Sequence, residues 1–518
     1  MYSDFCLKVN ISSHSIFTQT VKEEGKVIYR TDTITIAKTG CIVDKSGRAL
    51  TDAQIVDLYK THGLNISALF DGLYNLVVVD TKLEKAFIFH DHICGSGHIF
   101  YTFDGENIFI SSSIKNIINS YSSNEWMLDE FSIEEFVDKG YLTGNRTLIY
   151  NIFKTPNNKY TEFNLKNGLV ADRNYFFVEY DKKDNITSIR YNRILNESVS
   201  KCLKGKYAIG LSNDYDSVYT VFHARKIEPD RKTIKTYSAF SSCKKNAQIA
   251  NEICKSFDNV ESNVTQIHKN VLDFLPLIVY ITEGTAFDCN AFKDFEIARM
   301  LKRDGASSFV SSDGVDAVFT QHFYEGFDKF TEGFKNKLSS CRDALLKGNK
   351  HSRLSKNLFA DKFKNGILIQ SALIYNYFDV RYFNVYIFRK YLQTVYKKVT
   401  ADSSTKFHQQ SVRENVAENV LKNASSSMKK IDVLSLFTGE FNSKDIALIA
   451  SKSYFSKKYK RQYTDNREKA DYCLRIIYLE LFQTIFVGKH SDKMLKTKRF
   501  NYSLKAFFPK YFTKENEI

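Results

Sequence analysis

The sequence lacks the features that mark exported, membrane-spanning and disulfide-bonded proteins. No apolar run reaches membrane length and no charged-then-apolar leader stands at the start of the chain, so neither membrane insertion nor secretion is expected. The nine cysteines are odd in number and include no Cys-x-x-Cys pair, a pattern typical of reduced, scattered thiols. Proline is scarce, with 4 residues, which together with abundant Phe, Tyr, Lys and Asn indicates a coding bias more than a physical demand. These absences predict a cytoplasmic protein.

Positive charge is in excess but is not concentrated. The 74 basic and 59 acidic residues give a formal charge of +15, yet the two signs are mixed along the chain. The most basic part is the tail, residues 444–510, where a solvated helical face is the simplest interpretation and a docking surface for an acidic peptide or nucleic acid is the alternative. We therefore expect no nucleic-acid partner. At 518 residues, the chain should form at least two domains.

An apolar strand, a polar turn and a helix start follow one another directly near residue 210. Residues 207–211 form a short apolar run, and residues 218–224 carry apolar side chains at helical spacing. A strand-to-helix turn points unpaired backbone N–H groups and the positive end of the helix dipole at one place, which suits a pyrophosphate. Ser212 and Ser217 add hydroxyl donors there, and Asp216 adds a carboxylate able to hold Mg²⁺.

A second stretch of the same kind spans residues 307–319. It is another strand that ends in an acidic turn before a helix, and the turn contains Asp313 and Asp316. From residue 207 the strand-then-helix pattern repeats, which predicts a parallel sheet with helices on both faces and its ligand site at the carboxyl ends of the strands. Two carboxylates from neighbouring strand ends suit a Mg²⁺ bound to pyrophosphate, because Mg²⁺ takes few protein oxygens.

The two turns, in this order, resemble the ATP-binding loops of the asparagine-synthetase-like enzymes. Those loops are written Ser-Gly-Gly-x-Asp-Ser and Ser-Gly-Asp-Gly-Gly-Asp-Glu-Leu-Phe. The residues kept here are Ser212, Asp216, Ser217, Asp313, Gly314 and Asp316. The family's other loop glycines are replaced, and its Glu is Ala317; the glycine positions hold Asn213, Asp214, Ser312 and Val315. Asn and Asp tolerate positive φ best after Gly, but Asp214 would bring negative charge towards a polyphosphate.

The resemblance implies a set of site residues. Asp216 and Asp316 would hold Mg²⁺, and both would act in catalysis with Asp313, which lies where relatives address the acyl-adenylate or the incoming amine. Adenine would be received at the strand 234–240. The residues expected to bind ATP are Leu211, Ser212, Asn213, Asp214, Asp216, Ser217 and Ser238. The family's lysine for the transferring phosphate is not assigned; the candidates by chain order are Lys397, Lys398, Lys489 and Lys493.

The amino-terminal part is rich in strand patterns, with one helix near residues 52–59. It resembles the family's glutaminase domain, a sandwich of two antiparallel sheets between helices. Expected strands are 33–37, 73–79, 86–89 and 108–111. The glutaminase needs a cysteine freed at the chain start, whose own amine is its base; here Tyr2 follows Met1 and the nearest thiol is Cys6. We expect a scaffold that makes no ammonia.

A histidine-rich run follows one of these expected strands. His90 and His92 would point to one face of a strand, so two metal ligands are possible there, with Asp91, Cys94 and His98 nearby. The run has no closed ligand set, and the resemblance gives Asp91 a structural position. A structural role is therefore the favoured interpretation.

The predicted fold has two parts. Residues 1–200 should form an α+β, Ntn-hydrolase-like sandwich, a degenerate class II glutamine-amidotransferase-like domain with its linker. Residues 201–518 should form an α/β PP-loop domain of the adenine-nucleotide α-hydrolase type with a helical tail. After residue 319 the pattern is mainly helical, at residues 358–365, 367–377, 385–399, 412–421, 446–452 and 470–486.

The implied activity is ATP-dependent amide-bond formation through carboxylate adenylation, with a peptide or small carboxylate as substrate. Relatives without the leading cysteine include β-lactam synthetases and lasso-peptide cyclases. A cyclase is the first choice: it would close a macrolactam on a precursor peptide, with a leader-processing protein as partner. This step rests on family analogy. Two alternatives stay open, namely an asparagine-synthetase-like ligase for a small or surface-polymer substrate, and an inactive paralogue that serves as a binding scaffold.

Overall fold

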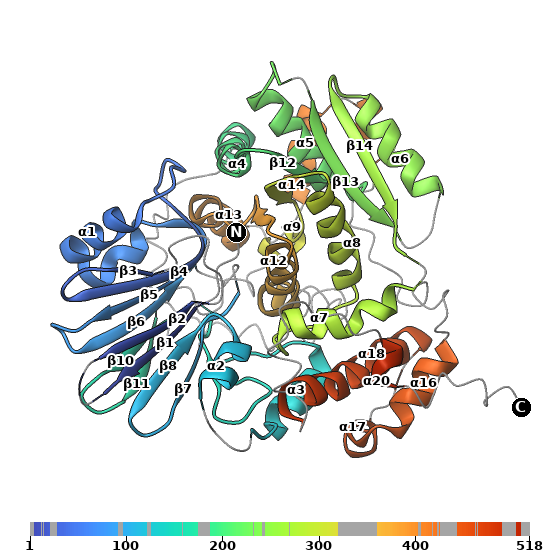
Figure 1. Ribbon diagram of the computed structural model, residues 1–518. Coiled ribbons are helices and arrows are strands. Elements are labelled where there is room, and N and C mark those ends of the chain that lie inside the picture. The colour runs from blue at the N-terminus through green and yellow to red at the C-terminus, as the bar shows by residue number, and fades with distance from the viewer. Residues whose placement is uncertain are drawn as a thin grey trace, which may run out of the picture.

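The computed structural model describes most of the chain, and Figure 1 shows how its elements are arranged. The described residues are 5–11, 13, 15–20, 28–91, 97–121, 126–157, 159–174, 187–231, 233–240, 244–268, 270–319, 360–401, 406–416, 418–421, 424, 443–460, 463, 465–488 and 504–508. The amino-terminal half is a sandwich of two antiparallel sheets, and the rest surrounds a parallel sheet.

The predicted antiparallel sandwich is present. One sheet has the order β2-β1-β8-β7-β9, with bounds Ile16–Thr20, Phe5–Asn10, Asn107–Ser111, Phe100–Phe103 and Phe153–Lys154. The other has the order β11-β10-β6-β5-β4-β3, with bounds Val170–Asn174, Lys159–Asn164, Lys85–His90, Asp71–Asp80, Ile34–Val43 and Ile28–Arg30. Every strand pairing within both sheets is antiparallel.

Alternation along β5 explains how the sandwich is layered. Val77 and Val79 pack into the core between the two sheets, whereas Leu76 and Val78 join the core beneath α1 (Asp52–His62). Side chains in a strand point alternately to opposite faces, so a strand buried on both faces reads as a continuous apolar run. This run made β5 predictable.

The second half is built on a five-stranded parallel sheet of order β14-β13-β12-β15-β16. The bounds are Val260–Gln266, Ile234–Phe240, Tyr207–Gly210, Ser308–Ser311 and Arg381–Asn384. The chain enters at the central strand, moves outwards to β14 and then returns to the other side of β12 at β15. The strand order therefore reverses between β12 and β15, and open α/β sheets bind ligands at such a point.

The described residues after 319 are mainly helical, as predicted, but they also include a strand that the sequence did not indicate. Besides helices, this region contributes β16, which pairs in parallel with β15 from Ser308 opposite Arg381 to Ser311 opposite Asn384. The four residues of β16 are too few to show an alternating pattern, and partners more than 70 positions away define the strand. The polar edge strand β14 was likewise not anticipated.

Helices cover the parallel sheet and form the tail. α8 (Asn290–Arg303) packs on β13, and α12 (Leu368–Tyr377) packs on β16 and on α8. α4 (Ser188–Cys202) and α14 (Lys406–Asn415) pack on α5 (Tyr215–Ile227). Among the described residues, the remaining helices of eight residues or more are α3 (Glu130–Lys139), α6 (Lys244–Lys255), α7 (Leu275–Thr282), α13 (Arg389–Ala401), α16 (Ser443–Lys452) and α18 (Asn466–Phe482). Across the described ranges, no helix combines the length and apolarity needed to cross a membrane.

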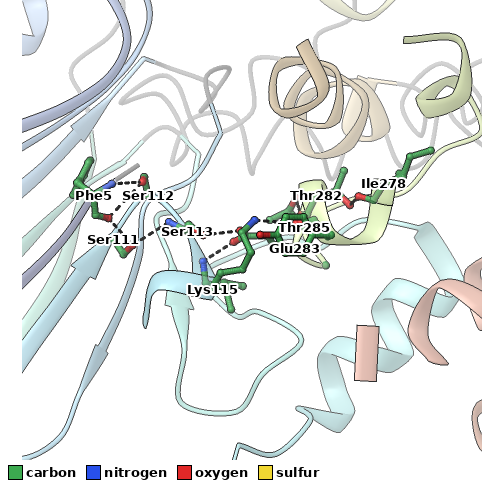
Figure 2. A network of polar contacts seen from close by, with 12 residues as sticks. Phe5, Ser111, Ser112, Ser113, Lys115, Ile278, Thr282, Glu283 and Thr285 are labelled. Atoms are coloured by element: carbon green, nitrogen blue, oxygen red, sulfur yellow. Dashed lines mark hydrogen bonds and ion pairs between the residues drawn. The ribbon is translucent and has the colours of Figure 1, made fainter. Parts of the chain in front are cut away.

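The two halves are joined through buried carboxylates. Glu283, at the end of α7, accepts hydrogen bonds from Ser113 Oγ at 2.6 Å and from the Ile114 backbone N–H, and it forms an ion pair with Lys115 (Figure 2). Asp71 pairs with Lys201 Nζ at 2.7 Å and accepts from the Arg389 backbone N–H at 3.2 Å. Hydrogen bonds and ion pairs that are shielded from water are stronger than exposed ones. These contacts therefore fix the position of the sandwich relative to the parallel-sheet half.

Candidate functional site

The first loop follows β12 at the carboxyl edge of the sheet. Asn213 has φ of 62°, in the left-handed region that favours glycine, and its side chain donates to the Asn246 carbonyl at 2.9 Å. Leu211 donates its backbone N–H to the Tyr237 carbonyl at 3.0 Å, and Ser238 Oγ donates to the Leu211 carbonyl. The strand predicted to receive adenine therefore fixes the start of the loop.

Asp214 is the N-cap of α5. Its Oδ1 accepts from the Ser217 backbone N–H at 2.8 Å and its Oδ2 accepts from Ser212 Oγ at 2.6 Å. Burial, and then the charge of Asp216, raise the pKa of Asp214 to about 6. These two donors, Ser217 N–H and Ser212 Oγ, are called the loop donors below.

Asp216, in the first turn of α5, is held by the tail. Its Oδ1 lies 3.0 Å from Nε2 of His408 on α14, and Nδ1 of His408 lies 2.6 Å from the Tyr191 hydroxyl on α4. His408 is buried, whereas the Asp216 side chain keeps 19% of its surface exposed. Sequence reasoning missed His408, because no local pattern indicates that residues 192 positions apart meet.

The second loop follows β15, next to β12. The Asp313 backbone N–H donates to Ser311 Oγ at 3.1 Å, and Asn384 Nδ2 of β16 donates to the Asp313 carbonyl at 2.8 Å. Asp316 is exposed in the first turn of the short helix α9 (Val315–Val318). The unpredicted strand β16 thus positions the loop that carries the predicted carboxylates.

The negative charges of the second loop act on Asp216 in the first. Burial raises the pKa of Asp216, His408 opposes this, and the charges of Asp316 and Asp313 raise it further. The structure therefore brings the sequence-predicted residues Asp216, Asp313 and Asp316 into one electrostatic cluster. Such a cluster has surplus negative charge, which a cation would relieve.

A pocket of about 80 Å³ opens between the loops and β13. Its charged lining comes from Lys293, Asp294 and Asp313, and its polar lining includes Ser212 and Ser238. Lys293 Nζ lies 3.8 Å from Asp313. Burial alone would lower the pKa of Lys293, but the charges of Asp313, Asp294 and other nearby carboxylates raise it above its usual value. The pocket therefore contains a lysine that stays charged.

Lys293 and Asp294 were not anticipated from the sequence. They are adjacent on α8, and Asp294 accepts from Ser371 Oγ at 2.6 Å. Burial raises the pKa of Asp294 to about 6, while Lys293 opposes the rise. The sequence could have indicated them, because this charged pair stands between Phe292 and Phe295, two buried residues of α8. Of the lysines named as candidates, Lys489 and Lys493 lie outside the described residues, as do the side chains of Lys397 and Lys398.

The carboxylates of the two loops could supply some of the ligands of a Mg²⁺ ion, but not all of them. In the described part of the chain, no group of three or more His, Cys, Asp or Glu side chains is arranged to hold a metal ion. Mg²⁺ usually takes one or two carboxylates and completes its shell with phosphate oxygens and water. Asp216 and Asp316, which repel each other, match that smaller requirement.

Gly314 offers a stability test of the second loop. Its φ is +97°, and a Cβ at this position would lie 2.1 Å from Cζ of the buried Phe363 ring. Gly105 has almost the same φ, +98°, with nothing within 4 Å. Gly314→Ala should lower the free energy of unfolding by about 1–3 kcal/mol more than Gly105→Ala, since only the former adds overpacking to backbone strain. Urea unfolding followed by circular dichroism measures both; equal losses would contradict the steric contribution.

Cys6, the thiol nearest the chain start, is buried in a strand. Cys6 lies within β1, pairs with Gln19 and Ser111 of neighbouring strands, and burial raises the pKa of its thiol. His90 is buried, with Nε2 3.0 Å from the Pro156 carbonyl, and His98 is buried beside Lys154. These contacts agree with a structural role for both histidines, while His92 and Cys94 lie outside the described residues.

Comparisons with known proteins bear on the amino-terminal half. Residues 44–176 match a family described as glutamine amidotransferase domain. No curated protein matches the chain. Three solved structures overlap with it at a TM-score of only 0.22: the allosteric regulatory enzyme of purine biosynthesis, the U34-tRNA thiolase from Methanococcus maripaludis, and glutamine phosphoribosylpyrophosphate amidotransferase from B. subtilis.

These structures share little sequence with the chain. In the same order, identities are 6%, 13% and 7%, the overlap covers 51%, 56% and 60% of this chain, and it covers 74%, 95% and 85% of the other chain. The family match covers the strands β5 to β11 of the sandwich. Residues 44–176 are therefore similar to glutamine amidotransferase domains.

Proposed function

We propose that this chain forms amide bonds by ATP-dependent adenylation of a carboxylate. One observation carries the proposal: the acidic loops after β12 and β15 meet where the strand order reverses, beside a pocket that contains the charged Lys293. Ligands bind at this point of open α/β sheets, and clustered carboxylates with a lysine suit a metal-bound polyphosphate.

The chemistry would proceed in two displacements. A carboxylate oxygen of the substrate attacks the α-phosphorus of ATP, and the bond from that phosphorus to the bridging oxygen of pyrophosphate breaks. An amine nitrogen then attacks the acyl carbon, the bond to AMP breaks, and the amine loses a proton. Lys293 would offset charge on the phosphates, and Asp313 is placed to contact the acyl-adenylate or the amine. When bound by Asp216 and Asp316, Mg²⁺ would neutralise charge on the leaving pyrophosphate.

The amine would come from the substrate itself. Cys6 lies within a strand with a raised pKa, so the amidotransferase-like domain would supply no ammonia and would act as a scaffold. We propose macrolactam formation on a precursor peptide, as in lasso-peptide cyclases, with a leader-processing protein as partner. A ligase for a small or surface-polymer carboxylate would use the same adenylation step and differ only in substrate.

A second candidate function is that of a binding scaffold without catalysis. Asp214 favours it, because its carboxylate already takes the loop donors that a pyrophosphate would need. The two candidates make opposite predictions for ATP chemistry.

ATP–pyrophosphate exchange tests the proposal. The full-length protein is incubated with ATP, Mg²⁺, labelled pyrophosphate and a pool of candidate precursor peptides. We expect label to enter ATP only when a peptide and Mg²⁺ are both present, and mass spectrometry should show a peptide product lighter by one water. Exchange that persists with excess EDTA would contradict the metal assignment. ATP binding without exchange for any carboxylate would favour the scaffold.

A further inference from the structure

Asp214 occupies the position that a bound anion would take. Its two carboxylate oxygens accept one hydrogen bond from each loop donor, at 2.8 Å from Ser217 N–H and 2.6 Å from Ser212 Oγ. The first of these donors is at the amino end of the 13-residue helix α5, where the helix dipole favours negative charge. Only 3% of the Asp214 surface is exposed, so water competes little for these bonds.

The pocket beside the loop gives a second, independent indication of an anionic ligand. Ser212 and Lys293 line the same pocket. The negative charges of Asp313, Asp294 and Asp214 raise the pKa of Lys293. A charged lysine in a pocket is a suitable counter-charge for phosphate. The loop donors and Lys293 are therefore suited to an anion. In this chain the Asp214 carboxylate already accepts from the loop donors.

An ordinary N-cap does not account for both contacts. A capping Asp needs only a backbone N–H of the first turn, which Ser217 supplies. The additional bond from Ser212 engages the hydroxyl that the resemblance assigns to phosphate. The family's glycine at this position could not engage either donor, because it has no side chain.

We propose that Asp214 is an internal anion that competes with pyrophosphate for the loop donors and thereby sets the affinity of this site for polyphosphates. This deepens the proposed function, on which it rests for the identity of the ligand. A polyphosphate would bind only after the Asp214 carboxylate gives up both bonds.

The matched test compares two glycine substitutions. Asp214→Gly removes the internal anion, whereas Asn259→Gly changes an exposed residue with φ of 57° in the turn before β14, away from the pocket. Isothermal titration with inorganic pyrophosphate and Mg²⁺ should show at least about tenfold tighter binding for Asp214→Gly than for wild type, since bonds to charged groups are strong. Asn259→Gly should bind like wild type.

A third variant separates the loss of the Asp214 charge from a loss of folding. Asp214→Asn keeps an acceptor for the helix but loses the charge, so its affinity should lie between those of wild type and Asp214→Gly. Circular dichroism confirms that each variant is folded. Equal affinities of wild type and Asp214→Gly, equal gains for both glycine variants, or no binding by folded Asp214→Gly would each overturn the proposal. Tight pyrophosphate binding by Asp214→Gly without ATP exchange would leave it standing and refute the adenylation function instead.

Discussion

Asp216→Ala is expected to reduce ATP–pyrophosphate exchange by about a hundredfold or more, because losing one electrostatic contact to a developing charge has effects of this size. Asp216 lies between the tail, through His408 at 3.0 Å, and the carboxylates of the second loop, whose charges raise its pKa. Asp216→Asn should lose nearly as much activity, since the amide keeps the size and the contact with His408 but not the charge that a metal ion needs.

The pair of substitutions separates two roles for this residue. If Asp216 serves only to hold α14 through His408, Asp216→Asn should keep most of the exchange and only Asp216→Ala should lose it. Asp230→Asn is the control, because Asp230 is exposed in the turn beyond α5 and should exchange like wild type. Initial exchange rates over a range of Mg²⁺ concentrations measure the effect, and rescue of Asp216→Asn at high Mg²⁺ would indicate weakened metal binding.

The loops were predictable because their information is local. The run 207–211 followed by Ser212, Asp216 and Ser217 defines a strand, a turn and a helix start within a few residues, and the structure has them in that order. The meeting of the two loops followed from the rule that parallel strands present their carboxyl ends at one edge. Sequence reasoning also identified the replaced glycines, but not that the Asp214 side chain takes both loop donors.

The residues that were missed depend on contacts between distant segments. His408 reaches Asp216 across 192 positions, and Asn384 reaches Asp313 across 71. Lys293 sits on a helix whose burial depends on packing against α12 and β13. A lysine in a helix is ordinarily a surface residue, so only the fold can distinguish this one from its neighbours.

Glu283→Gln is expected to lower the free energy of unfolding by about 3–5 kcal/mol, because removing one partner of a buried ion pair leaves the other charge uncompensated. Lys115 would lose its counter-charge with only 15% of its side chain exposed. Ser113 Oγ donates to Oε1 of Glu283 and the Ile114 N–H donates to Oε2, so the amide nitrogen of Gln would leave one of these two donors without its acceptor (Figure 2). Glu261→Gln, on the exposed edge strand β14, should change the free energy of unfolding by less than about 0.5 kcal/mol.

The contact of Glu283 with residues 113–115 joins the two halves, so its loss should affect the unfolding of both. The sole tryptophan, Trp126, packs in the core that runs from the sandwich into the parallel sheet, so its fluorescence reports on unfolding near the junction. Urea titration followed by Trp126 fluorescence and by circular dichroism should give coincident curves for wild type, and curves that separate for Glu283→Gln if the halves come apart first. A double variant with Lys115→Met should recover part of the loss, since it removes the orphaned charge. An unchanged midpoint for Glu283→Gln would mean that water reaches this junction and that apolar packing alone joins the halves.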